Sequence, residues 1–307
     1  MNSLNQVLKK YELKPNCYRK SGSATIVDSK QGKFVLKPKK EISDDSIYKY
    51  LESRNFNYYP MRLNKDEDDD YQISEYIEDI DMPEDQKILD MIELVSLLHY
   101  KTTHYKEVDE DDYKKIYEDI MNNVNYLYSY YIDIISIIET KVYMSPSEYL
   151  LARNISKVFA AIEFSRGELE KWYNLVKDKR KQRLVVLHNN LEINHFIRNN
   201  NSYLISWDKA KIDMPIFDLY KLYRKHALDF EFDVILRTYE KNYPLLEEER
   251  KLLFILITLP DKIEFDDNEY EMCKKISRQI DIIYKTESLL SPYYSAKKED
   301  KSYNKET

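Results

Sequence analysis

The chain has 307 residues, of which 34% are charged, and a formal net charge of -7 at pH 7. This length exceeds the usual size of one hydrophobic core, so we expect one large bilobal domain or two lobes that share a cleft. Because both signs of charge are mixed and the balance is mildly acidic, we expect no nucleic-acid partner.

The cysteines and the N-terminus indicate a cytoplasmic protein without a membrane span. Cys17 and Cys273 lie far apart, which fits neither a disulfide framework nor the spacing of metal ligands. The N-terminus lacks the apolar core of a signal peptide, and no stretch approaches the roughly 20 apolar residues that a span requires. We therefore expect a reducing, cytoplasmic location.

Strand patterns dominate the first part of the chain. The β-prone runs at residues 24–28 and 33–37 flank a turn with glycine, which predicts a hairpin. A helix should begin near residues 43–45, where serine and aspartate can cap it. A further strand is expected at residues 71–77, and the acidic run at residues 66–70 is most simply a solvated turn.

The rest of the chain is predicted to be mainly helical, because apolar residues recur with a period of about 3.6. Pro146 predicts a break between two helices, with Ser145 or Ser147 as the cap. Two β-prone runs, at residues 184–187 and 202–207, interrupt the helical pattern and predict an embedded hairpin. Both runs lead into polar residues, so we look for chemistry there.

Four features in a fixed order carry a resemblance to a known superfamily. Lys37 ends a predicted strand, Glu52 lies on the predicted helix, and Asp208 follows a later strand. Residues 187–196 read Leu-His-Asn-Asn-Leu-Glu-Ile-Asn-His-Phe. This segment resembles the His-Gly-Asp-Leu-x-x-x-Asn pattern of aminoglycoside phosphotransferases and choline kinases. Over residues 5–260, the chain resembles the spore coat proteins of the CotS type within that superfamily.

The resemblance implies a protein-kinase-like fold and ATP-dependent phosphoryl transfer, which relies on positioning and charge neutralisation. Lys37 would contact the phosphates and be held by Glu52. Asp208 would bind Mg²⁺, since carboxylate oxygen is the ligand that this ion prefers. The strand end near Glu75 and Ile77 would contact the adenine through its backbone. The implied cofactors are therefore ATP and Mg²⁺.

Two substitutions depart from the family pattern. The catalytic aspartate falls at Asn190, and losing a general base costs about 10²- to 10⁴-fold in rate. The metal-binding asparagine falls at His195, a poor ligand for Mg²⁺ that suits softer metals or a structural role. A loop shorter by one residue would place Asn194 there instead, although Phe196 favours His195. Glu192 could act as a substitute base.

Two further positions have expected roles within this pattern. His188 is expected to orient the catalytic loop through backbone contacts. Residues 21–23, Ser-Gly-Ser, contain a single glycine where the superfamily brings backbone close to phosphate. This scarcity indicates weaker nucleotide binding.

Together these observations predict an α+β, bilobal fold with a small β-rich N-terminal lobe and a large, mainly helical C-terminal lobe. The nucleotide-binding N-terminal lobe is expected at residues 1–80 and the helical lobe at residues 81–296. Within the helical lobe, a catalytic-loop hairpin should occupy residues 184–210. The polar residues 297–307 should form a flexible tail.

Three functional hypotheses follow. The first is a degenerate, pseudokinase-like protein that serves as a binding or assembly component in spore formation. It would act in the mother-cell cytoplasm or the spore coat with a coat or other protein as partner. The second is an active ATP-dependent phosphotransferase on a small hydroxyl or amine substrate. The third is a helical interaction protein in which the kinase-like motifs are coincidental.

Overall fold

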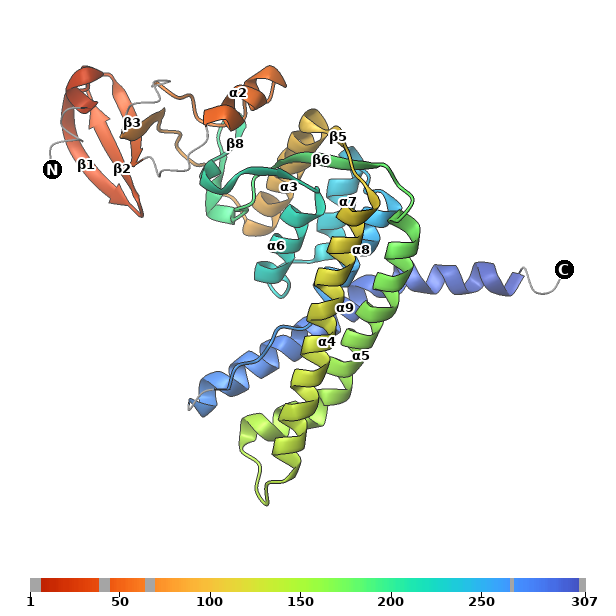
Figure 1. Cartoon of the computed structure of the whole chain (residues 1–307). Helices are drawn as coiled ribbons and strands as arrows, with labels where there is room; N and C mark the ends of the chain where they lie inside the picture. Colours follow the sequence, from red (N-terminus) through yellow and green to blue (C-terminus); the bar gives the residue numbers. More distant parts are fainter. Residues whose placement is uncertain (1–6, 39–44, 64–69, 266–267, 304–307) are drawn as a thin grey trace. The chain divides into compact units, whose positions relative to one another are not determined.

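A computed structural model describes residues 7–38, 45–63, 70–265 and 268–303 (Figure 1). Two predictions fall partly outside these ranges. Residues 43–44 of the expected helix start and residues 66–69 of the acidic run are not among the described residues.

The chain divides into two compact units. The first unit combines the N-terminal strands with the segment that was predicted to hold the catalytic loop. The lobe boundary predicted at residue 80 stays a prediction. The first unit contains Met1–Thr103, Val185–Asp213 and Lys241–Tyr243, and the second contains His104–Leu184, Met214–Glu240 and Pro244–Thr307.

An antiparallel sheet with the order β1-β2-β3-β4 opens the first unit. Alternating side chains bury Val27, Leu36 and Ile73 on one face, where they form a small core. The predicted β2–β3 hairpin is confirmed, whereas β1 was not predicted because its sequence is polar and its residues are mostly exposed. The four strands are β1 (Pro15–Ser21), β2 (Ala24–Ser29), β3 (Gly32–Pro38) and β4 (Tyr71–Glu75).

Two helices complete the N-terminal part of the first unit. The expected helix is present as α2 (Asp45–Ser53), which buries Leu51. An irregular segment at residues 76–83 connects β4 to α3 (Glu84–Thr102). The apolar face predicted for α3 is confirmed, since its residues are buried: Ile88, Met91, Ile92, Val95 and Leu98.

The embedded hairpin was predicted with the wrong partners. The strand at residues 184–187 belongs to β6 (Lys181–Leu187), and β6 does not pair with the run at residues 202–207 in the described chain. Residues 185–187 of β6 pair with β9 (Lys211–Asp213) in the first unit. The later run forms only the short strand β8 (Ser202–Leu204), which pairs with β7 (Phe196–Arg198). Leu204 and Phe196 face each other there and are both buried.

Helices make up most of the second unit. Ser145, one of the two cap residues that the sequence offered, caps α5 by accepting a hydrogen bond from the Glu148 N–H. Pro146 is the first residue of this helix. α4 and α5 lie side by side and share a core with α9 that includes Tyr131 and Ile162 (Figure 1). The helices are α4 (Glu110–Glu139), α5 (Pro146–Val176), α6 (Ile216–His226), α7 (Phe232–Asn242), α8 (Glu247–Thr258) and α9 (Glu269–Tyr303).

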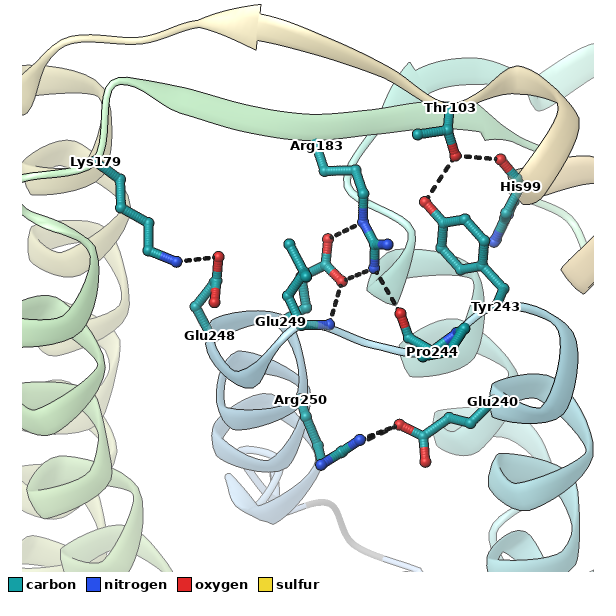
Figure 2. A network of polar contacts seen from close by, with 11 residues as sticks. His99, Thr103, Lys179, Arg183, Glu240, Tyr243, Pro244, Glu248, Glu249 and Arg250 are labelled. Atoms are coloured by element: carbon teal, nitrogen blue, oxygen red, sulfur yellow. Dashed lines mark hydrogen bonds and ion pairs between the residues drawn. The ribbon is translucent and has the colours of Figure 1, made fainter.

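A buried ion pair joins β6 to the start of α8 in the second unit (Figure 2). The Arg183 Nε donates to Glu249 Oε1 at 2.9 Å, and a second guanidinium nitrogen pairs with Glu249 Oε2. Their side chains are only 9% and 5% exposed. Glu249 also accepts the Leu246 N–H at 3.0 Å, and Arg183 donates to the Pro244 carbonyl at 3.0 Å. Charge-assisted hydrogen bonds between Arg183 and Glu249 therefore connect β6 to the start of α8.

A flexible tail was predicted from residue 297. α9 continues as helix to Tyr303, and residues 304–307 lie outside the described residues. The flexibility of this tail stays a prediction. None of the helices in the described ranges combines the length and apolar character needed to cross a membrane.

Candidate nucleotide site

Lys37 and Asp208 meet in the first unit. Lys37 lies near the end of β3, and Asp208 lies in the short 3-10 helix η2 (Trp207–Lys209). The ammonium group of Lys37 pairs directly with the carboxylate of Asp208, and the two side chains are 24% and 29% exposed. The fold thus brings together the residues expected to contact phosphate and metal, and in this state each neutralises the other.

Glu52 does not lie at Lys37. Among the described residues, Lys37 forms its ion pair with Asp208, and the predicted Lys37–Glu52 pair is not formed. Glu52 instead lines a cavity of about 240 Å³ together with Tyr59 and Arg62. The pKa of Tyr59 is raised to about 12, mainly because the phenol is buried. The negative charge of Glu52 and its hydrogen bond to Tyr59 raise this pKa further.

The raised pKa of Tyr59 predicts a loss of stability in alkaline solution. The folded protein holds the phenol proton more tightly than the unfolded chain, where the pKa is about 10.0. The stabilising contribution is therefore complete below pH 10.0 and is lost as the pH rises to about 12. Tyr59→Phe removes the hydroxyl and its hydrogen bond to Glu52, so it should lower the free energy of unfolding by about 1 kcal/mol at neutral pH. The deficit should shrink as the pH rises through this window.

Urea denaturation across that pH range measures the effect. Tyr270→Phe is the matched control, because Tyr270 is 74% exposed. A deficit of Tyr59→Phe that stays constant with pH would contradict the role assigned to burial and Glu52.

His188 is fully buried at the end of β6 and contacts the segment that leads to Asp208. Its Nε2 faces the Ile205 carbonyl oxygen at 2.8 Å, so this nitrogen carries the proton and donates. Its ring packs edge-on against Trp207, with ring centroids 4.8 Å apart. These contacts are what the expected loop-orienting role requires.

Two side chains contact Asn190, and a third contacts the neighbouring backbone. The Lys209 Nζ donates to Asn190 Oδ1 at 3.4 Å, and the His195 Nδ1 donates to the Asn190 carbonyl oxygen at 2.7 Å. Asn189, in a left-handed conformation with φ of 61°, donates to the Lys209 carbonyl oxygen at 2.6 Å. The residue that the sequence resemblance aligned with the catalytic base is therefore an amide that faces an ammonium group.

The sequence left open whether His195 or Asn194 takes the position of the metal-binding asparagine, and whether Glu192 acts as a base. His195 is half-buried and bonded to the loop, whereas Asn194 is exposed. This arrangement favours the register in which His195 takes the position of the family asparagine. Glu192 is half-buried just before the 3-10 helix η1 (Ile193–His195), and its use as a substitute base stays a prediction.

Lys209 was not among the predicted site residues. It follows Asp208 directly and lies outside residues 187–196, the segment compared with the superfamily pattern, so that pattern gave no reason to select it. The only available signal was its place beside the predicted metal ligand.

Glu75 and Ile77 lie where β4 passes into the irregular segment before α3. The Glu75 carboxylate accepts the Met61 N–H at 3.0 Å. The Ile77 N–H and C=O make no hydrogen bond within the described part of the chain. Both groups therefore remain available to a bound ligand, which supports the expected contact with adenine.

The residues present do not fit Mg²⁺, which prefers a nearly octahedral set of hard oxygen ligands. Asp208 is paired with Lys37, the Asn190 amide oxygen faces Lys209, and His195 offers imidazole nitrogen. Across residues 7–38, 45–63, 70–265 and 268–303, no group of three or more His, Cys, Asp or Glu residues could hold a metal ion.

Comparison with solved structures identifies the fold. An aminoglycoside phosphotransferase from Alicyclobacillus acidocaldarius matches with a TM-score of 0.69 and 10% identity, covering 94% of this chain and 95% of that chain. The chain has a protein-kinase-like fold. The predicted α+β class is confirmed, with a small antiparallel sheet in the N-terminal region and a large helical C-terminal region.

Two other solved structures are similar over most of their length. An AMP-bound spectinomycin phosphotransferase matches at a TM-score of 0.50 and 11% identity, covering 95% of this chain and 94% of that chain. A choline kinase from Streptococcus pneumoniae matches at a TM-score of 0.49 and 16% identity, covering 90% of this chain and 98% of that chain. No protein-family model matches the sequence, and no curated protein matches it significantly.

Proposed function

We propose that this chain is a pseudokinase-like protein that binds a nucleotide and has lost most of its phosphotransfer activity. The observation that carries the proposal is Asn190 at the position of the family base, with its amide oxygen held by the Lys209 ammonium group. An amide cannot accept the proton of an acceptor hydroxyl, and the adjacent cation disfavours proton uptake further.

Two features of the structure and one comparison support nucleotide binding. Lys37 lies beside Asp208, so a cation is present near the catalytic segment. The Ile77 backbone groups remain open to a purine edge. A protein with the same fold, the spectinomycin phosphotransferase, has been solved with AMP bound. These features support retention of the nucleotide without the general base.

The assembly role rests on the sequence resemblance alone. The resemblance to spore coat proteins implies that the folded chain serves as a component in spore formation, in the mother cell or the coat, with a protein partner. In this proposal the nucleotide stabilises the fold for that partner and is not consumed.

The test combines binding with turnover. A nucleotide at 100 times its dissociation constant should stabilise the protein by about 2.7 kcal/mol, measured as a shift in melting temperature. Lys37→Met should abolish the shift, while Lys30→Met, an exposed lysine in the β2–β3 turn, should retain it. Radiolabelled ATP should show no transfer above background.

Two results would count against the proposal. If neither ATP nor ADP shifted the melting temperature, the proposed nucleotide binding would be contradicted. Turnover that Asp208→Ala abolishes would instead identify an active phosphotransferase on a small hydroxyl or amine substrate, which is the alternative function.

A further inference from the structure

The candidate nucleotide site has a charge balance that does not need a divalent ion. The Lys37 ammonium group pairs with the Asp208 carboxylate, and the Lys209 ammonium group contacts the amide oxygen of Asn190. The position of the family base adds an amide in place of a second carboxylate. The site is therefore positive by one charge before any metal is added, with Lys37, Lys209 and Asp208 counted.

The atoms that could coordinate a metal ion at this site also disfavour Mg²⁺. Asp208 Oδ1 faces the Lys37 ammonium group, and Asn190 Oδ1 faces the Lys209 ammonium group. His195 uses Nδ1 to donate to the Asn190 carbonyl, so its remaining donor atom is an imidazole nitrogen, which Mg²⁺ binds poorly. A lysine, by contrast, binds phosphate oxygen as a point charge without any coordination geometry.

We propose that this site binds a nucleoside di- or triphosphate without a divalent metal, with the Lys209 ammonium group contacting the phosphates in place of the ion. The inference rests on the proposed function and adds the means by which phosphate charge is neutralised. Lys209 is exposed, and within the described residues its ammonium group contacts a neutral amide at 3.4 Å, so it can turn to a ligand at little cost.

The test compares ADP and ATP binding to the full chain in excess EDTA with binding in excess Mg²⁺ or Mn²⁺, by calorimetry. We expect equal affinity, within about 2-fold, in all three conditions. Lys209→Met should weaken binding in EDTA by about 10-fold, because a charge-assisted hydrogen bond to phosphate is lost. Lys211→Met is the matched control, since Lys211 lies two residues away and pairs with Asp213 at 2.5 Å. It should bind as the natural chain does.

The possible outcomes separate this inference from the proposed function. A rise in affinity of about 10-fold or more with Mg²⁺ or Mn²⁺ would overturn the metal-free site. Equal losses in the two lysine variants would overturn the role of Lys209. Lys209→Gln gives a second substitution if the methionine variant melts at a lower temperature. No binding in any condition would overturn the proposed function itself.

Discussion

The double variant Asn190→Asp/His195→Asn should hydrolyse ATP in the presence of Mg²⁺ faster than the natural chain by about 10²-fold or more. The first substitution supplies a carboxylate that can accept a proton from the attacking group. The second replaces an imidazole with an oxygen ligand, which Mg²⁺ accepts more readily. Phosphate release at saturating ATP, with and without Mg²⁺, measures the gain.

The single variants provide the controls for this experiment. His195→Asn alone should stay close to the natural rate, because no base is present. Asn190→Asp alone should gain less than the double variant, because the metal ligand is still missing. If the double variant were no faster than the natural chain, Asn190 and His195 would not be what limits the chemistry. If Glu192 acts as the base, the natural chain itself should turn over and Glu192→Gln should abolish that activity.

Glu249→Ala should lower the free energy of unfolding by about 3–5 kcal/mol, since it leaves the buried Arg183 charge uncompensated. Figure 2 shows that Glu249 is the carboxylate that Arg183 faces. The substitution also removes the acceptor of the Leu246 N–H at the start of α8. Urea denaturation followed by circular dichroism measures the loss.

Two comparisons identify the cause of the expected loss. Glu240→Ala breaks the more exposed pair with Arg250, also drawn in Figure 2, and should cost only about 0–1 kcal/mol. The apolar pair Arg183→Met/Glu249→Leu should recover most of the stability, because no charge remains buried. A loss in Glu249→Ala no larger than in Glu240→Ala would show that Arg183 is solvated in solution.

Local sequence signals predicted the elements that depend on neighbouring residues. The turn at Gly32 and a serine cap beside Pro146 were predicted correctly because a glycine with positive φ and an N-cap act within a few residues, although the sequence did not choose between Ser145 and Ser147. The strands β1, β5 (His104–Glu107) and β9 were missed. They are short or polar, and their pairing partners lie elsewhere in the sequence, as with β5 and residues 181–184 of β6.

The candidate site was predictable as a set of positions but not as a set of contacts. The order of motifs located Lys37, Asn190, His195 and Asp208, yet Lys37 and Asp208 are 171 residues apart. Which partner a flexible lysine selects depends on the three-dimensional arrangement, and the structure gives it Asp208 rather than Glu52. Lys209 was missed for the same reason, since its proximity to Asn190 arises from the turn that follows β8.

The Lys37–Asp208 ion pair also determines how the site should respond to ionic strength. A nucleotide that takes Lys37 must first release it from Asp208, so one ion pair is exchanged for another and few counterions are displaced overall. The dissociation constant of the nucleotide should therefore vary less with salt than it would at a site with two phosphate-binding lysines and no carboxylate. The internal carboxylate competes with the ligand for Lys37, and it lowers the affinity more in dilute than in concentrated salt, where the ion pair is screened.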